Sequence, residues 1–268
     1  MSNRYYENLK RPVALLLLYF LVEIMFSFFL IPFYALQEIN KEEVNGLCTT
    51  SYIAVICVSI ISLFVTICFA KYYLKMFKWH DIIKPMGTNM LWATILVAAS
   101  VFGIIGLNII SEIVNLPDLN KDFFRDNSQH FWGVIVASIV APIGEEILFR
   151  SACLGWMQAK GVNTILAILF SSIIFGIVHL NPIQIFFATG LGVILGLLYW
   201  YSRSLILPIV VHVINNTMSS CVNIFNSDFK ISELFDNIIV SLGFSTLCLV
   251  VCAFSFWRFI MVNRCQPK

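Results

Sequence analysis

Residues 141–150 read A-P-I-G-E-E-I-L-F-R and place two adjacent carboxylates and an arginine inside an apolar run. An acidic or basic side chain at the centre of a membrane helix costs about 2.5–3.5 kcal/mol. Glu146 and Arg150 are four residues apart, so on a helix they form a neutralising pair. Glu145 points about 100° away around the same helix and has no partner in its own segment. We therefore expect Glu145 to meet a side chain of another helix, or water.

Two further apolar runs carry imidazoles: F-G-I-V-H ends at His179, and H-V-I-N-N begins at His212. A carboxylate and an imidazole on different helices can hold a water molecule between them and deprotonate it, which is the role we expect for Glu145 and His179. His212 and Asn216 lie one helical turn apart and offer two donors for an oxyanion. The set predicts amide hydrolysis that uses neither a serine nor a cysteine nucleophile.

A purely structural role is the alternative for each of these residues taken alone. Glu146 and Arg150 would then form a buried strut, and the histidines would join helices by hydrogen bonds. Taken together, polar residues on three separate runs, with no comparable set elsewhere in the chain, favour a catalytic site. Glu23 stands alone near the centre of the first apolar run, and the sequence assigns it no partner or role.

Proline and glycine residues in two of the apolar runs predict local changes in helix geometry and packing. Pro142 has no N–H to donate, so we expect the helix to bend or loosen just before Glu145. With Gly144, this would let water approach the carboxylates; a kink that is merely tolerated is the alternative. Gly192 and Gly196 form a G-x-x-x-G pattern, which predicts close packing of two helices.

The elements that position these residues follow from composition. Of 268 residues, 59% are hydrophobic and 12% are charged, and the mean hydropathy is +0.87. Soluble domains carry about 25% charged residues. Runs of about 20 apolar residues span the ~30 Å of a bilayer core. We therefore predict an all-α polytopic membrane protein with about eight transmembrane helices, at 12–36, 52–73, 90–114, 130–158, 163–180, 182–201, 205–225 and 237–262.

Loop charges predict the orientation. Twelve of the 17 lysines and arginines fall at the termini and in alternate loops on one side, which predicts that both termini are cytoplasmic. The composition, rich in Phe, Ile, Asn and Lys, suggests a bacterial cell membrane. The net charge of +2 gives no support to a nucleic-acid partner. Most of the eight cysteines lie in apolar runs, which argues against a disulfide framework. The oligomeric state is not predicted.

The chain divides around the polar set. We expect a scaffold of three spans over 1–129, a catalytic core of four spans over 130–223, and a last span with its tail over 224–268. The segment 115–129 is expected to be a solvated loop, and a cover over an outer cavity is the less favoured alternative. No internal repeat is detected, which weakens a transporter interpretation.

The motif E-E-x-x-x-R occurs on one membrane run, F-x-x-x-H on the next, and H-x-x-x-N two runs later. Over about residues 130–223 the chain resembles the CPBP family of intramembrane proteases, which comprises type II CAAX prenyl endopeptidases and bacterial relatives such as Abi bacteriocin-immunity and lysostaphin-resistance-like proteins. The resemblance implies that Glu145 and His179 activate water and that His212 and Asn216 form the oxyanion pocket. It also implies that Glu146 and Arg150 support the site.

A metal is the open alternative for the chemistry. Two histidines and a glutamate can hold a catalytic zinc with an open position, and the ligands would be Glu145, His179 and His212. The chain has no H-E-x-x-H motif, and the resemblance implies a metal-free, glutamate-dependent protease. We therefore expect no cofactor and keep zinc as the second choice.

The expected partners are the lipid bilayer and a hydrophobic peptide or membrane-protein substrate. The bacterial relatives imply a role in bacteriocin self-immunity or peptide maturation. A second interpretation is a non-catalytic immunity or peptide-binding protein of the same fold. A third, less favoured, is an ion-coupled transporter that uses Glu145 and the histidines as a proton relay.

Overall fold

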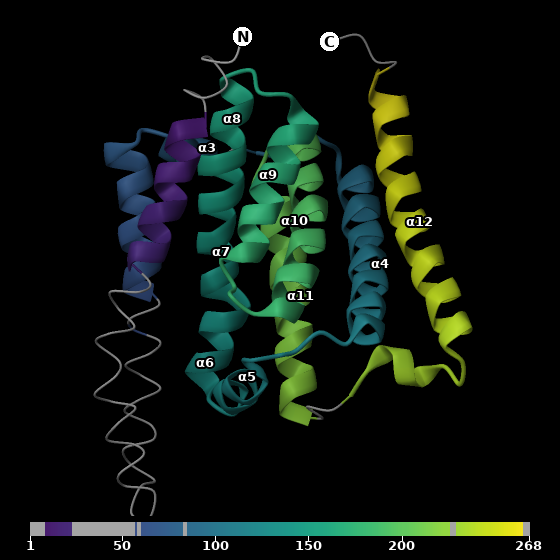
Figure 1. The fold of residues 1–268 in the computed structure, drawn as a ribbon. Helices are drawn as coiled ribbons and strands as arrows, with labels where there is room; N and C mark the ends of the chain where they lie inside the picture. Colours follow the sequence, from purple (N-terminus) through teal and green to yellow (C-terminus); the bar gives the residue numbers. More distant parts are fainter. Residues whose placement is uncertain (1–8, 23–56, 58–59, 83–84, 226–228, 265–268) are drawn as a thin grey trace, which may run out of the picture.

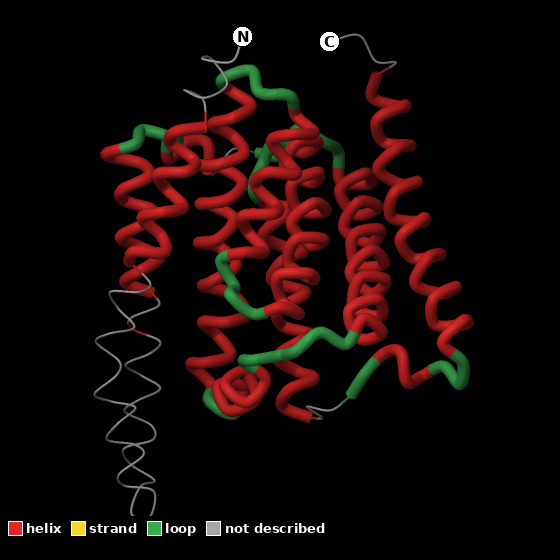
Figure 2. The backbone as a smooth tube through the Cα atoms, viewed as in Figure 1, coloured by secondary structure: helices red, strands yellow, loops and turns green. Residues whose placement is uncertain are grey.

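The computed structural model describes residues 9–22, 57, 60–82, 85–225 and 229–264. These residues form helices and turns, and no β-strand occurs among them (Figure 2). The chain is therefore an all-α polytopic membrane protein, as the composition predicts. Glu23, and most of the first predicted span, lie outside the described residues.

Long helices run side by side and are joined by short turns and short helices (Figure 1). In chain order, they are a helix over 9–22, a helix over Ile60–Tyr73 that ends in η1 (Phe69–Tyr73), α3 (Trp79–Ile82), α4 (Met90–Val114), α5 (Lys121–Ser128), α6 (Phe131–Ile135), η2 (Val136–Val140), α7 (Ala141–Glu146), η3 (Ile147–Gly155), α8 (Trp156–Ala159), α9 (Thr164–Ile177), α10 (Pro182–Ser202), α11 (Ile206–Phe225), η4 (Ile231–Leu234) and α12 (Ile238–Arg264).

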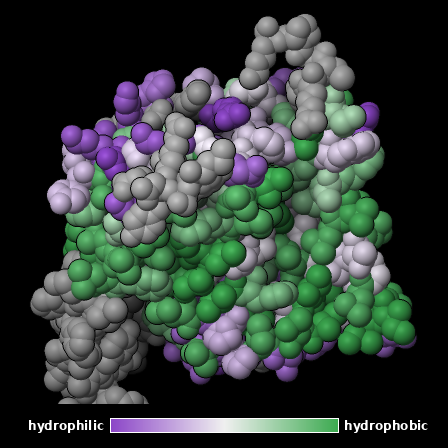
Figure 3. Space-filling view, turned by 45° about the horizontal axis from the view of Figure 1, so that its top comes forward, coloured by the Kyte–Doolittle hydropathy of each residue, from purple (hydrophilic) through white to green (hydrophobic). Residues whose placement is uncertain are grey.

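Each predicted span from 90 onward coincides with a described helix or with an unbroken series of helices, to within a few residues at the ends. Four of the described helices are long and apolar enough to cross a membrane, namely Met90–Val114, Phe131–Ala159, Pro182–Ser202 and Ile238–Val262. Helices Ile60–Tyr73 and Thr164–Ile177 are apolar but shorter. On the face drawn in Figure 3, hydrophobic residues form a belt between hydrophilic ones.

The helix over 9–22 begins, and α12 ends, at the same end of the bundle (Figure 1). The turns that follow α8 and α10 also lie at this end, so Lys160 and Arg203 share it. The described residues thus agree with the predicted grouping of basic turns.

The elements from α6 to α8 follow one another without a break and form a single rod over Phe131–Ala159. Its η2 and η3 segments have π-helical hydrogen bonding, in which the N–H of Ala141 donates to the carbonyl of Val136. Such wider turns are rare and occur frequently at functional sites. The predicted loosening before Glu145 is confirmed, because η2 ends one residue before Ala141-Pro142.

Helices α9 and α10 pack closely through their small residues. A Cβ added to Gly192 would meet Ser172 Cα at 2.9 Å, and one added to Gly196 would meet Ile168 at 3.0 Å. The predicted packing role of this glycine pair is confirmed. The turn between α9 and α10 lies part-way along the bundle and not at its end (Figure 2). The turn that carries His179 therefore lies at a depth part-way along the bundle.

The segment 115–129 differs from the expected solvated loop, because most of it forms helix α5. This helix packs against α11 and lies across the end of the bundle opposite the start of helix 9–22 (Figure 1). Arg125 and Asp122 form an i,i+3 pair at 3.0 Å on its exposed side. The helix is short and mostly polar, so it lacks the apolar periodicity by which helices are predicted.

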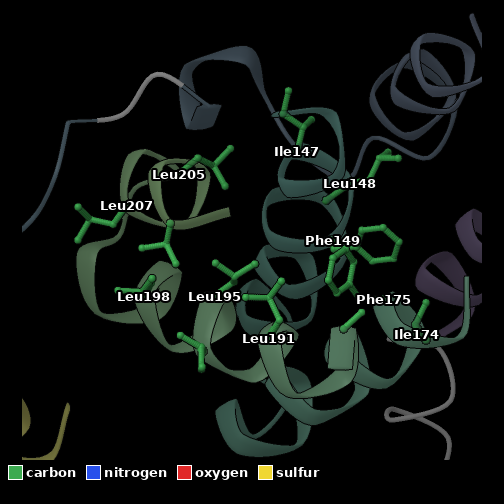
Figure 4. Close-up of a cluster of buried hydrophobic side chains, with 14 of the residues drawn as sticks. Ile147, Leu148, Phe149, Ile174, Phe175, Leu191, Leu195, Leu198, Leu205 and Leu207 are labelled. Carbon is green, nitrogen blue, oxygen red and sulfur yellow. The ribbon is translucent and has the colours of Figure 1, made fainter. Parts of the chain in front are cut away.

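The apolar core lies between η3, α9, α10 and the start of α11 (Figure 4). It surrounds the rod segment that follows the two glutamates, and its labelled members are Ile147, Leu148, Phe149, Ile174, Phe175, Leu191, Leu195, Leu198, Leu205 and Leu207. The rings of Phe149 and Phe175 meet edge-on with centroids 5.2 Å apart. The polar side chains are thus set against a tightly packed apolar wall.

Candidate active site

Glu146 lies at the centre of a buried polar cluster. Its Oε2 is 3.1 Å from Nε of Arg150, and its Oε1 is 2.9 Å from Nδ1 of His212 on α11. The side chains of these three residues are at most 3% exposed. The predicted i,i+4 pair within the rod is confirmed. Because the carboxylate accepts, the imidazole of His212 donates its Nδ1–H to Glu146.

Glu145 meets the other nitrogen of the same imidazole. Its Oε2 is 3.7 Å from Nε2 of His212, beyond a direct hydrogen bond. The expectation that Glu145 finds a neighbour on another helix is confirmed. The Glu145 side chain is 20% exposed, against 0% for Glu146. Of the two carboxylates, only Glu145 can therefore reach a water or substrate atom without unfolding the cluster.

The charged groups of this cluster are partly balanced. Arg150 and Glu146 neutralise each other as ions, and an unbalanced charge in a buried site costs several kcal/mol. Glu145 lies outside this buried pair, is partly exposed and has the imidazole of His212 as its neighbour.

The buried guanidinium of Arg150 also has contacts outside the ion pair. Its Nη2 donates to the carbonyl of Gly192 on α10 at 3.3 Å, and its Cζ lies 4.5 Å from the ring centroid of Phe175 on α9. A cation over an aromatic face is stabilised by the ring quadrupole. Arg150 therefore ties the rod to both α9 and α10 while it neutralises Glu146.

His179 is held against Phe175. Its Nδ1 is 2.8 Å from the carbonyl of Phe175, and because a carbonyl only accepts, Nδ1 carries the proton and Nε2 has a lone pair. The ring of Phe175 meets His179 at 5.2 Å and His212 at 5.6 Å, edge-on in both cases. No hydrogen bond or ion pair between His179 and Glu145 occurs among the described residues. Phe175 contacts both imidazoles. The pairing of His179 with Glu145 through water stays a prediction.

Asn216 is anchored to the loosened turn of the rod. In π-helical register, the carbonyl of Ala137 would accept from residue 142, but Pro142 has no N–H. Asn216 Nδ2 donates to this orphan carbonyl at 2.9 Å, and Asn216 Oδ1 accepts from Asn215 Nδ2 at 2.9 Å. The amide plane is therefore fixed. A side-chain amide nitrogen has two protons, so one N–H has no partner among the described residues.

Gly144 has a different role from the one expected. A Cβ added at this position would lie 2.0 Å from Cδ2 of Leu63, so the glycine lets the helix Ile60–Tyr73 approach the rod closely. Gly144 itself is buried. The expected water path along Gly144 is therefore wrong, since an apolar side chain fills that side of the rod.

A zinc site would require Glu145, His179 and His212 to converge. No group of three His, Cys, Asp or Glu side chains among the described residues is arranged to hold a metal ion. Glu145 lies 3.7 Å from Nε2 of His212, whereas His179 is tied to the carbonyl of Phe175. This donor arrangement does not fit zinc.

Sequence reasoning missed three participants. Phe175 was noted only for its spacing from His179, whereas its ring contacts Arg150 and both imidazoles. The carbonyls of Ala137 and Gly192 carry no side-chain signal. Only the proline five residues after Ala137 indicates in the sequence that its carbonyl lacks an internal partner.

Comparison with known proteins places this site in a family context. Residues 127–218 match the family described as type II CAAX prenyl endopeptidase Rce1-like. The segment is similar to an Rce1-like CAAX protease domain. It contains all six motif residues and both carbonyls named above, and it nearly coincides with the resemblance expected over 130–223. The predicted family resemblance is therefore confirmed for this part of the chain.

Two curated relatives carry related names. The "Putative membrane peptidase YdiL" of Bacillus subtilis (strain 168) is 40% identical over 84 residues, which are 31% of this chain and 34% of that protein. The "Membrane-embedded CAAX protease MroQ" of Staphylococcus aureus (strain USA300) is 34% identical over 90 residues, 31% of this chain and 36% of that protein. The chain thus spans about a third of the length of the relatives it matches. No solved structure matches.

Proposed function

We propose that this protein is an intramembrane endopeptidase that uses activated water to cut a hydrophobic peptide or membrane-protein segment. The observation that carries the proposal is the chain of contacts that begins at fully buried Arg150 and ends at Glu145, which is 20% exposed. The likeness of residues 127–218 to CAAX proteases supports the same reaction.

Glu145 is proposed as the general base. The imidazolium form of His212 balances its charge, and Glu145 takes a proton from a water molecule that faces a substrate carbonyl. His179 offers Nε2 as an acceptor for the second proton of this water, because its Nδ1–H is held by Phe175. The hydroxide equivalent then attacks the carbonyl carbon, and a C–O bond forms as the C=O π bond opens to an oxyanion.

The oxyanion is proposed to face His212 and Asn216. His212 gives its Nδ1–H to Glu146, so it can donate from Nε2 only in its protonated form. The second N–H of the Asn216 amide is the other donor. One preorganised donor of this kind is typically worth about 10²–10³ in rate.

The net charge of the cluster stays constant during the attack. Glu145 becomes neutral as the negative charge appears on the oxyanion, and the imidazolium of His212 stays beside both positions. Collapse of the tetrahedral intermediate breaks the C–N bond, and the proton held by Glu145 goes to the leaving amine. Because His212 is already in place beside both positions, the surrounding dipoles need not reorganise as the negative charge shifts from Glu145 to the oxyanion.

The proposal also covers the organisation of the chain, its location and its physiological role. We assign the catalytic core to 130–223, the scaffold to 1–129 and a last span to 224–268. The proposed location is a bacterial cell membrane, with both termini in the cytoplasm. The mechanism uses no metal or other cofactor, and the physiological role is peptide maturation or bacteriocin self-immunity.

The test compares peptide termini in the source cell between the wild type and the Glu145→Gln variant, with both proteins at matched abundance. The matched control is Glu233→Gln, which removes an exposed carboxylate that pairs with Lys230 at 3.7 Å. We expect a set of membrane-associated or secreted termini that disappears in Glu145→Gln and persists in Glu233→Gln. Identical termini in all three strains, with the cellular phenotype intact, would instead identify a non-catalytic peptide-binding or immunity protein.

A further inference from the structure

The turn that carries His179 has a strained backbone. The N–H of His179 donates to Gly176 and that of Leu180 to Ile177, both at 3.1 Å, which closes α9. Leu180 then takes φ +51°, a left-handed conformation that is an outlier for a bulky residue. Such a conformation persists only where the surroundings over-determine it.

Asn181 supplies the constraint from the opposite side of the turn. Its side chain is fully buried, and its Nδ2 donates to Asp118 Oδ1 at 2.7 Å. Its Oδ1 accepts from the N–H of Leu119 at 3.2 Å. The N–H of Ile183, in the first turn of α10, donates to the carbonyl of Pro117 at 3.3 Å. Segment 117–119 is thus clasped to the α9–α10 turn by three hydrogen bonds.

This clasp joins a turn inside the bundle to the segment that follows the end of α4. The α9–α10 turn lies part-way along the bundle, and the segment that leads from α4 to α5 passes beside it (Figures 1 and 2). A buried amide with both ends paired is costly to break, because each lost partner leaves an unsatisfied polar group. The clasp therefore fixes the turn where His179 needs a defined ring direction.

We propose that Asn181, with Asp118 as its partner, is the positioning residue that holds His179 with Nε2 directed away from Phe175. Asn181 does not touch the reacting atoms and acts only through the turn. The catalytic consequence rests on the proposed function, whereas the effect on the His179 ring does not. A positioning role of this kind extends the site to the segment 117–119.

The chemistry of the pair allows a swap. Asn181 Nδ2 and Asp118 Oδ1 are 2.7 Å apart in the wild type. Asn181→Asp places a second carboxylate next to that of Asp118, so the two repel each other and the clasp breaks. Asp118→Asn keeps an acceptor oxygen for the Asn181 amide, so its effect is smaller. The double variant Asp118→Asn/Asn181→Asp reverses donor and acceptor, and the Leu119 N–H still meets a carboxylate oxygen. Only the exposed N–H of Asn120, which donates to Asp118 Oδ1 at 3.1 Å, loses this acceptor. If the swap restores the properties of the wild type, the hydrogen bond between positions 118 and 181 is what matters. If it does not, position 181 needs an asparagine for another reason.

The first measurement is the rate at which diethyl pyrocarbonate modifies His179, followed by mass spectrometry of the full chain in nanodiscs. His212, which is buried on α11, is the internal reference. We expect Asn181→Asp to raise the rate at His179 about tenfold, the change for a lost bond of about 1.4 kcal/mol. The double variant should return to the wild-type rate. An unchanged rate in Asn181→Asp, or no return in the double variant, overturns the proposal.

The second measurement is substrate processing in the same variants, with Glu145→Gln as the inactive reference. We expect Asn181→Asp to lose most processing and the double variant to regain it, at equal protein abundance. Normal processing in Asn181→Asp while Glu145→Gln is inactive overturns the positioning role and leaves the protease intact. Normal processing in Glu145→Gln rejects the protease instead, and the modification rates alone then decide whether Asn181 holds His179.

Discussion

His212 and Glu146 lie 66 residues apart in the sequence, and Nδ1 of the one is 2.9 Å from Oε1 of the other. This contact joins α11 to the rod at the position where Arg150 already neutralises the carboxylate. It orients the imidazole so that only Nε2 faces Glu145. One buried carboxylate therefore sets both the charge and the direction of the group proposed to face the oxyanion.

Arg150 and Glu146 should contribute non-additively to the free energy of unfolding. Arg150→Met removes the cation that neutralises buried Glu146, and we expect a loss of about 3–5 kcal/mol in the free energy of unfolding. The double variant with Glu146→Gln should cost less than the sum of the two single variants. Denaturant unfolding of the purified protein in detergent measures all three. Arg125→Met is the control, because its pair with Asp122 is exposed and worth about 0–1 kcal/mol. Additive single costs would contradict a coupled pair.

His179 and His212 should separate in activity and stability. His179→Gln removes an acceptor for the water and should lower kcat by about 10²–10⁴. Its unfolding temperature should change little, because this half-buried side chain has a backbone carbonyl as its hydrogen-bond partner. His212→Gln should lower both, since Glu146 loses a buried donor. Assays on a peptide found in the terminus comparison give kcat, and thermal scans give stability. A His179→Gln variant with wild-type kcat would remove His179 from the mechanism.

Asn216 and Pro142 should be linked through the carbonyl of Ala137. Asn216→Ala leaves this carbonyl unpaired and should cost about 1–3 kcal/mol of unfolding free energy. In a Pro142→Ala background the new N–H at position 142 can take over the carbonyl, so the same change should cost less. A double-mutant cycle by denaturant unfolding measures the difference. Equal costs in the two backgrounds would show that Asn216 stabilises the protein by other contacts.

Chelators should leave the proteolysis unchanged. The donor arrangement around Glu145 does not fit zinc, so treatment of the purified protein with 1,10-phenanthroline should alter neither the rate of peptide cleavage nor the unfolding temperature. The non-chelating 1,7 isomer is the control for binding of the reagent itself. Loss of activity with the chelator alone, followed by recovery on addition of zinc, would instead favour the metal mechanism through Glu145, His179 and His212.

Much of the fold is readable from the sequence because it depends on local patterns. Apolar runs of membrane length located the helices from 90 onward, since a span needs a nearly continuous apolar stretch. The pair of Glu146 and Arg150 follows from a spacing of four residues on one helix. The π-helical turn before Glu145 follows from the missing N–H of Pro142. Helix α5 was not predicted from the sequence because its stability depends on packing against α11.

The order of the contacts within the site was decided only by the tertiary structure. The motifs select Glu145, His179, His212 and Asn216 as candidates, but they do not state which nitrogen of His212 faces which glutamate. That choice depends on how α11 is rotated against the rod, and this rotation is set by side chains far apart in the sequence. The depth of His179 depends likewise on where α9 ends and on the clasp between Asn181 and Asp118. Periodicity indicates which residues share a helix face, whereas contacts between helices depend on the packing of the whole bundle.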